Sequence, residues 1–344
     1  MAVQPPLTTR EIRLARAPVG LPRPEHLAVV EVPLPAPRAG QVIVRNRHFL
    51  VFPGLRTLIG GEVEGVPLPP VHVGDTLFGP AIGEVVAVGP GSGLRPGDLV
   101  SHLRGWREHA VLGDDDCAPL SDVLPDPVAF LSSGVAAYGA LTRLAVVRPG
   151  DTVLVTGAAG AVGSLGGQVA RLLGAGRVVG STRSPGKAAR LKAELGYDAV
   201  VVPGSEPLAE QLAAAAPDGV DVLLDTVGGE QLTAAVGAAR RGARFALVGA
   251  LSGQLSAEHD HDGTTAPAEI DTFRVITLGI TLRGFGSSDL GEMAEEWNKR
   301  FGAWLRSGEI VFPHVRIAGI DRAPWVLQEL FEGRHIGTVV VDLP

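Results

Sequence analysis

The chain has 344 residues, a formal net charge of -7 and one cysteine, Cys117. One cysteine excludes an intrachain disulfide and a four-cysteine zinc site, and it is typical of a reducing compartment. The acidic balance argues against nucleic acid or an anionic membrane as a partner, because no basic field would attract either. Residues Met1 to Arg10 lack the apolar core of a secretory signal, and no apolar run reaches the roughly 20 residues of a membrane span. We therefore expect a cytoplasmic protein.

Residues 1–126 are expected to form a β-rich domain. Short apolar segments alternate there with turns that contain Gly and Pro, and the clearest are Gln41–Val44, Gly83–Val88 and Asp98–Ser101. Such segments are typical of strands.

From 127 to 307, buried-strand patterns alternate with Ala-rich helical patterns. This alternation predicts a doubly wound, parallel sheet. The expected strands are Thr152–Val155, Arg177–Val179, Ala199–Val202, Val220–Leu224 and Arg244–Val248. The expected helices are Gly163–Leu173, Lys187–Leu195, Pro207–Ala215 and Gly229–Arg240.

From 308 to 344 the β pattern returns in Ile310–Ile317 and Thr338–Val341, around a helical stretch at Ala323–Phe331. We infer that this C-terminal part rejoins the first domain. The expected fold class is therefore α/β, with a Rossmann sheet inserted into a β-rich domain.

The strongest motif is the glycine-rich turn Gly157–Gly163 (GAAGAVG), between the expected strand Thr152–Val155 and the expected helix. Small residues let the backbone approach a pyrophosphate, and free N–H groups at the helix start can bind its charge. Ala158 replaces the first glycine of the usual motif, so the strand–turn–helix context carries the interpretation. The alternative is a tight turn that binds no ligand.

The segment after the second expected strand, Gly180–Lys187, indicates which dinucleotide binds. A site for NAD usually places Asp or Glu there to bind the ribose 2′-hydroxyl. This segment has no carboxylate, and Arg183 and Lys187 can instead pair with a 2′-phosphate. NADP is therefore the expected cofactor, although both cations could simply be solvated.

Together these segments resemble the medium-chain dehydrogenase/reductase superfamily. The narrower resemblance is to its zinc-free leukotriene B4 12-hydroxydehydrogenase / prostaglandin reductase-like group of alkenal and enone reductases. The residues that carry it are Gly157–Gly163, Ser184–Lys187, Asp225–Glu230 (DTVGGE), Val248–Ser252 (VGALS) and Gly333–Val340 (GRHIGTVV). The resemblance implies a GroES-like catalytic domain around a Rossmann NADP-binding domain, a homodimer, and NADPH as hydride donor to the β-carbon of an enone, enal or enoyl thioester.

The resemblance also implies which residues bind the cofactor. Lys187 matches the family lysine beside the 2′-phosphate, Gly160 and Gly163 match the pyrophosphate turn, and Val248–Ala250 match a segment along the ribose and nicotinamide. The full expected set is Ala159, Gly160, Ala161, Val162, Gly163, Ser181, Arg183, Lys187, Val227, Val248, Gly249, Ala250, Phe285 and His335.

The substrate pocket departs from the family pattern. The family segment D-P-Y-M-R reads Phe52-Pro53-Gly54-Leu55-Arg56 here, so its Asp and Tyr are missing. A second family tyrosine falls within Gly284–Asp289, where none exists. We expect Phe49, Phe52 and Arg56 to line a rebuilt pocket, and the hypothesis is an unusual substrate of specialised metabolism. No metal is expected, because Cys117 has no matching His ligands.

The proton donor is the least determined part of the prediction. Tyr138 matches the tyrosine of the family's T-A-Y stretch, Arg56 could hold a substrate carbonyl, and Ser287 or Ser288 could donate where the family has a tyrosine. In the alternative, Tyr138 packs at the domain junction, Arg56 is a surface cation, and the ribose hydroxyl with water completes the chemistry. Quinone reduction, or a non-redox or cyclising function that retains NADPH, also stays open, because fold does not fix function.

Overall fold

The computed structural model describes residues 7–62, 65–66, 68–204, 206–256, 265–286 and 290–344. The chain forms two compact units. The first comprises Met1–Leu131, His314–Arg334 and Thr338–Pro344, and the second comprises Ser132–Pro313 and His335–Gly337. The C-terminal part of the chain thus returns to the first unit, except for a tripeptide that belongs to the second.

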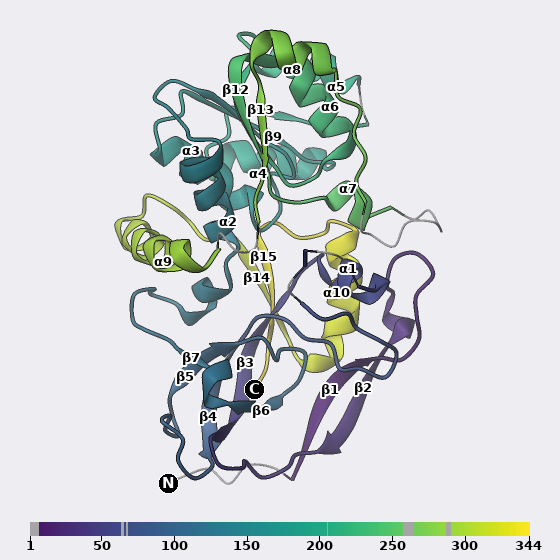
Figure 1. Cartoon of the computed structure of the whole chain (residues 1–344), viewed down its shortest axis with the longest axis vertical. Helices are drawn as coiled ribbons and strands as arrows, with labels where there is room; N and C mark the ends of the chain where they lie inside the picture. The colour runs from purple at the N-terminus through teal and green to yellow at the C-terminus, as the bar shows by residue number, and fades with distance from the viewer. Residues whose placement is uncertain (1–6, 63–64, 67, 205, 257–264, 287–289) are drawn as a thin grey trace. The chain divides into compact units, whose positions relative to one another are not determined.

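The first unit is built mainly from antiparallel strands (Figure 1). Its strands are β1 (Thr8–Leu14), β2 (Leu27–Pro33), β3 (Gln41–Val51), β4 (Ala81–Val88), β5 (Leu99–His102), β6 (His109–Gly113), β7 (Ala118–Pro119), β14 (His314–Ala318) and β15 (Thr338–Asp342). Its helical elements are η1 (Pro24–His26), α1 (Leu55–Gly60), η2 (Asp114–Asp116), η3 (Pro127–Leu131), η6 (Ile320–Arg322) and α10 (Ala323–Phe331).

A seven-stranded sheet in the order β14-β15-β3-β4-β5-β7 forms the centre of this unit, and β6 also pairs with β3. Strand β3 is buried on both faces at Val42, Ile43 and Val44, and Val42 and Val44 point to the same face because successive side chains of a strand alternate. They pack with Val85 and Val100 into one buried cluster that includes Cys117.

The second unit is a doubly wound α/β fold. Its strands are β8 (Thr152–Val155), β9 (Arg177–Ser181), β10 (Ala199–Val201), β11 (Val220–Asp225), β12 (Ala239–Leu247) and β13 (Thr281–Gly284). Its helices are α2 (Gly134–Gly139), α3 (Gly163–Leu172), α4 (Pro185–Glu194), α5 (Leu208–Ala215), α6 (Gly229–Gly237), α7 (Leu251–Gln254), α8 (Thr272–Leu278) and α9 (Leu290–Ser307), with a π-helical turn η4 (Ala140–Leu144) after α2.

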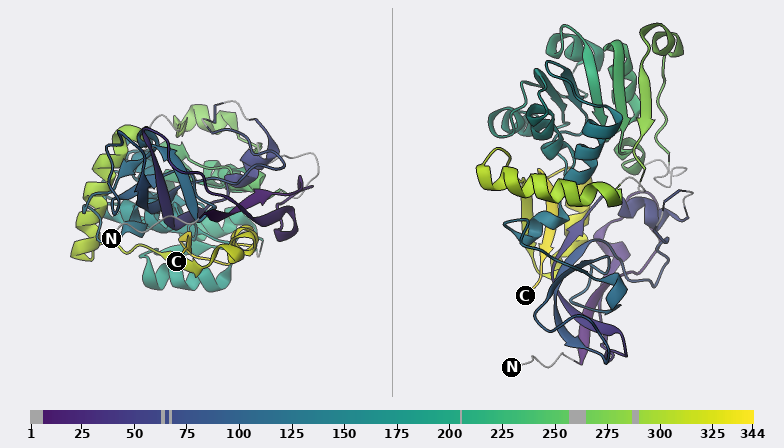
Figure 2. Two further views of the ribbon diagram at one scale, coloured as in Figure 1. Left: turned by 90° about the horizontal axis from the view of Figure 1, so that it is seen from below. Right: turned by 60° about the vertical axis from the view of Figure 1, so that its left-hand side comes forward.

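The six strands of this unit are all parallel, in the order β10-β9-β8-β11-β12-β13. Helix α3 lies on one face of the sheet and α5 and α6 lie on the other (Figures 1 and 2). The strand order reverses between β8 and β11, and sheets of this kind bind ligands in the crevice outside the strand ends at such a point. This architecture, beside a separate β-rich unit, confirms the expected fold class.

Candidate functional site

The glycine-rich turn connects β8 to α3 at the carboxyl edge of the parallel sheet. Gly157 has a φ of +61°, which favours glycine. A Cβ atom on Gly163 would lie 2.4 Å from the carbonyl oxygen of Gly157, so glycine is required there for the turn to close. Gly160 is different, because it is exposed and a Cβ atom on it would meet only the Gly157 oxygen, at 3.3 Å. The turn is therefore tightly packed on its inner side and open at Gly160.

Ser181 holds the glycine-rich turn in place through hydrogen bonds. Its hydroxyl accepts a hydrogen bond from the Gly157 N–H at 3.0 Å and donates one to Oε1 of Gln231 at 2.5 Å. Its carbonyl accepts from the Ala158 N–H at 2.8 Å. Because Ser181 is only 2% exposed, it supports the turn rather than reaching out to a cofactor. Gln231 was not expected from the sequence; its only signal was its place directly after the DTVGGE segment.

The two cations predicted to bind the phosphate, Arg183 and Lys187, lie at the junction of β9 and α4. Arg183 is exposed and Lys187 is half-buried. The Ser184 hydroxyl accepts from the Lys187 N–H at 3.4 Å and so begins the helix. Burial, followed by the charges of Arg183 and Arg190, lowers the pKa of Lys187. The site therefore offers positive charge, and no carboxylate, at the place where the 2′ substituent of a dinucleotide binds.

The tripeptide His335–Gly337 completes the nucleotide side of the second unit. Gly337 donates from its N–H to the carbonyl oxygen of Ala159 at 2.9 Å. The Lys187 ammonium group donates to the carbonyl oxygen of His335. His335 thus lies next to the cation expected to bind the phosphate, where a direct cofactor contact is feasible.

The carboxyl end of β11 and the segment after β12 form a further side of the candidate nucleotide site. Asp225 is buried and accepts from the Thr156 hydroxyl at 2.5 Å and from the Gly228 N–H at 3.0 Å. Its carbonyl accepts from the Val248 N–H at 2.7 Å, which anchors the segment Val248–Ala250 beside Thr226 and Val227. These contacts fix the loops after two neighbouring strands in one place.

Phe285 follows the edge strand β13, and its N–H donates to the carbonyl oxygen of Leu247 at 2.9 Å. Its ring lies against Gly139 at the end of α2, where an added Cβ atom would be 2.8 Å away. Phe285 as a whole residue is half-buried.

Tyr138 is held inside the second unit. It is 3% exposed, its ring packs against Trp297 and Trp304, and its hydroxyl donates to Oε1 of Glu296 at 2.5 Å. Burial, and then the hydrogen bond to Glu296, raises the pKa of Tyr138 to about 12. These contacts favour the packing alternative over a role as proton donor.

The three expected pocket residues lie in the first unit and differ in accessibility. Phe52 is half-buried, and its ring occupies the space left by Gly54 and Gly79. Phe49 is fully buried against Trp106, with ring centroids 5.2 Å apart, so it supports other residues rather than touching a substrate. Arg56 on α1 is 4% exposed, so the alternative that it is a surface cation is wrong.

The remaining expectations concern Ser287 and Ser288, metal binding and a membrane span. Ser287 and Ser288 lie outside the described residues. Within the described part of the chain, no three His, Cys, Asp or Glu side chains gather as they would around a metal ion. Among the same described residues, no helix has the length and hydropathy needed to span a membrane.

Comparisons with known proteins agree with this geometry. Residues 161–304 match the family model described as zinc-binding dehydrogenase, and residues 10–120 match the one described as the N-terminal domain of oxidoreductase. The chain is 31% identical to the putative NADP-dependent oxidoreductase YfmJ of Bacillus subtilis, over 97% of each chain. It is 29% identical to the NADPH-dependent curcumin reductase of Escherichia coli, over 95% of each chain.

The structural comparison gives the same result. CurA from Vibrio vulnificus, solved in complex with NADPH, superposes with a TM-score of 0.87 at 28% identity, over 97% of this chain and 99% of that one. The glycine-rich turn, the strand order and these matches along almost the whole length agree with one another. The chain belongs to the medium-chain dehydrogenase/reductase superfamily, in its prostaglandin reductase-like group.

Proposed function

We propose that the chain is an NADPH-dependent oxidoreductase that reduces an activated C=C bond in a small enone, enal or enoyl thioester. The observation that carries the proposal is the site after β9, where Arg183 and Lys187 replace the acid of an NAD site next to an open glycine turn. The names of the relatives support both the cofactor and the reaction class. The curcumin reductase and the 2-alkenal reductase of Nicotiana tabacum are named as reductases, and both are NADP(H)-dependent.

The residues of the second unit fit the cofactor in three groups. The free N–H groups at the start of α3, from Ala161 to Gly163, would hold the pyrophosphate. Arg183 and Lys187 would hold the 2′-phosphate. The remaining contacts would come from Ala159, Gly160, Val227, Val248, Gly249, Ala250, Phe285 and His335. Bound there, NADPH supplies the hydride, and the protein supplies orientation and electrostatics.

The substrate side is assigned to the β-rich domain, residues 1–126 with 308–344, and the cofactor side to residues 127–307. Phe52 offers a partly accessible ring, and Arg56 a guanidinium group already withdrawn from bulk water. A buried guanidinium group binds a carbonyl oxygen more strongly than a solvated one does. Arg56 is therefore the residue that we expect to hold the substrate carbonyl.

We further propose a cytoplasmic homodimer. Strand β13 is the last strand of the parallel sheet. On the neighbouring helix α8, Phe273 is 73% exposed and Ile276 is 76% exposed. An edge strand beside exposed apolar side chains is suited to pairing with a second copy of the chain.

The test is NADPH oxidation by the purified protein with a panel of enones, enals, enoyl thioesters and quinones, using NADPH deuterated at C4 of the nicotinamide. We expect turnover with members of the first three classes, and deuterium at the β-carbon of the product. Turnover with quinones alone would identify a quinone reductase. NADPH binding without oxidation by any compound would indicate a non-redox function, and either result would overturn the proposal.

A further inference from the structure

Gln231 on α6 reaches across the end of a strand in the second unit. Gly228 and Gly229, with φ of +74° and +54°, turn the chain sharply from β11 into α6. Gln231, the third residue of α6, thereby meets Ser181, the last residue of β9, whose hydroxyl donates to Gln231 Oε1 at 2.5 Å. Strand β8 lies between β9 and β11, so the Gln231 side chain spans the strand that leads into the glycine-rich turn.

The hydrogen bonds of Ser181 determine how the Gln231 amide is oriented. The Ser181 hydroxyl accepts from the Gly157 N–H at 3.0 Å, and its single proton goes to Oε1 of Gln231. Oε1 therefore faces Ser181, and the Nε2 end of the same planar amide faces away from it. An amide oxygen has two lone pairs, so Oε1 can accept a second hydrogen bond beside the one from Ser181.

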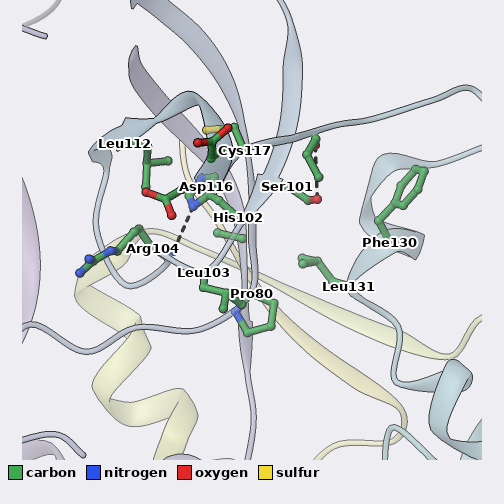
Figure 3. Close-up of a pocket in the computed structure, with 13 residues that line it drawn as sticks. Pro80, Ser101, His102, Leu103, Arg104, Leu112, Asp116, Cys117, Phe130 and Leu131 are labelled. Atoms are coloured by element: carbon green, nitrogen blue, oxygen red, sulfur yellow. Dashed lines mark hydrogen bonds between the residues drawn. The ribbon is translucent and has the colours of Figure 1, made fainter. Parts of the chain in front are cut away.

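The Nε2 group of Gln231 is a donor that the described part of the protein does not use. Among the described residues it has no hydrogen-bond partner. Several other polar atoms of these residues are both buried and unpartnered, such as Nε2 of His102 in the pocket of Figure 3. Gln231 Nε2 is not one of them, and the residue is half-buried, so the amide nitrogen retains surface that a ligand can reach.

The adenine base of the expected cofactor belongs at the same strand end. Arg183 and Lys187, which are assigned to the 2′-phosphate, follow Ser181 closely in the chain. The base is attached to the ribose carbon next to the one that carries the 2′-phosphate, so a ribose held by these cations brings its adenine to the end of β9. Glutamine and adenine are complementary, because the amide N–H donates to a ring nitrogen while the amide oxygen accepts from the 6-amino group.

We propose that Gln231 is a specificity-determining residue of the cofactor site, which recognises adenine through a pair of hydrogen bonds. Its Nε2 donates to a ring nitrogen of the base, and its Oε1 accepts from the 6-amino group. This inference rests on the proposed function, because it requires NADP(H) at this edge of the sheet. The same side chain supports the glycine-rich turn through Ser181, so one residue joins base recognition to the turn assigned to the pyrophosphate.

The test replaces the 6-amino group of the base. Nicotinamide hypoxanthine dinucleotide phosphate carries a carbonyl oxygen there and keeps the 2′-phosphate and the pyrophosphate of NADP⁺. Calorimetric titration of the wild-type protein should give a dissociation constant about fivefold or more higher for the hypoxanthine analogue than for NADP⁺. Equal constants would overturn this inference and leave the reductase proposal standing, whereas binding of neither nucleotide would overturn both.

Gln231→Met separates base recognition from support of the turn. Methionine is similar in length but has no amide, so both contributions are lost. Loss of turn support weakens the binding of both nucleotides by the same factor, whereas loss of base recognition weakens the binding of NADP⁺ alone. The ratio of the two dissociation constants should therefore fall to about one in Gln231→Met. It should keep its wild-type value in Glu230→Ala, which changes the exposed neighbouring residue. A wild-type ratio in Gln231→Met would overturn the proposal.

A second measurement stands if the Met variant does not fold. In wild-type protein with ¹⁵N-labelled glutamine, the Nε2 resonances of Gln231 are assigned by their absence from Gln231→Glu, which keeps an acceptor for the Ser181 hydroxyl. Saturating NADP⁺ should shift these resonances further than the saturating hypoxanthine analogue does. Equal shifts with the two nucleotides would also overturn the proposal.

Discussion

The ammonium group of Lys187 donates a hydrogen bond to the backbone carbonyl of His335, 148 residues further along the chain. Lys187 lies in the first turn of α4, after the second strand of the parallel sheet, whereas His335 lies just before the last strand of the other unit. The contact places the tripeptide His335–Gly337 next to Lys187, the cation expected to bind the phosphate. It also orients the Lys187 side chain without neutralising its charge, because a carbonyl group carries none.

Lys187→Ala should weaken NADPH binding selectively. A charge-assisted contact to a phosphate contributes roughly 1.5–3 kcal/mol, so the dissociation constant for NADPH should rise about tenfold or more. The constant for NADH, which lacks the 2′-phosphate, should barely change. Lys192→Ala is the matched control, because it removes one exposed charge from the same helix. Equal losses for both nucleotides would contradict the assignment.

The preference for NADPH should decline at alkaline pH. Lysine is charged below its pKa, and the pKa of Lys187 is lowered from 10.5, so the charge is lost at a lower pH than in an ordinary lysine. The ratio of the NADPH and NADH affinities should therefore fall as pH rises toward 10.5, and Lys187→Arg should flatten the profile because arginine stays charged. Titrations with NADPH and with NADH, each followed by the fluorescence of its reduced nicotinamide, give the two dissociation constants. A ratio independent of pH in the wild type would refute this linkage.

Local pattern was enough to predict much of the second unit. The expected strand Thr152–Val155 and the observed β8 have the same bounds, because an apolar run ends there at a glycine turn. The expected helix Gly229–Arg240 was wrong at its end: α6 stops at Gly237 and β12 begins at Ala239. Ala239 pairs with Val220, and Arg240 forms an ion pair with Asp221, so sheet pairing overrides the helical propensity of the segment.

The candidate site was predictable only where one segment carries it. The turn Gly157–Gly163 and the cations Arg183 and Lys187 were identified because each lies at a fixed place after a strand. The partners of Tyr138 and Lys187, which are Glu296 and His335, lie far away in sequence. No spacing rule predicts such tertiary contacts, so the engaged hydroxyl of Tyr138 could not be foreseen.

Tyr138→Phe should leave turnover within about twofold of the wild type. An oxyanion donor typically contributes about 100- to 1000-fold, but the Tyr138 hydroxyl already donates to Glu296 and its pKa is raised to about 12. The variant should lose about 1 kcal/mol of unfolding free energy, the usual cost of one hydrogen bond. Turnover under saturating NADPH and urea unfolding measure the two effects. A tenfold fall in turnover with NADPH binding intact would restore Tyr138 as a donor.

Acid should destabilise the protein through His102. Its pKa is about 4 in the folded state and 6.5 when unperturbed, so between these values the unfolded chain binds more protons than the folded one. Stability from this group is therefore present above pH 6.5 and is lost as pH falls to 4, by about 3 kcal/mol. His102→Gln removes this titration, so its unfolding free energy should fall less steeply over that range. Parallel pH profiles for the two proteins would show that His102 makes no such contribution.

Two glycines of the nucleotide turn should respond differently to an added methyl group. In Gly163→Ala the new Cβ atom would lie 2.4 Å from the Gly157 oxygen, so the backbone must shift, at a cost of about 1–3 kcal/mol of unfolding free energy. In Gly160→Ala the nearest atom is the Gly157 carbonyl oxygen, 3.3 Å away, which need move by only a few tenths of an ångström, so the loss of unfolding free energy should be smaller than in Gly163→Ala. The methyl group would nevertheless occupy the open side of the turn, where the pyrophosphate is expected.

The affinity of Gly160→Ala for NADPH and NADH should therefore fall together, by about tenfold or more, because both carry the pyrophosphate. Chemical unfolding and nucleotide titration of the two variants separate packing from binding. Unchanged affinity for both nucleotides in Gly160→Ala would place the pyrophosphate away from this turn.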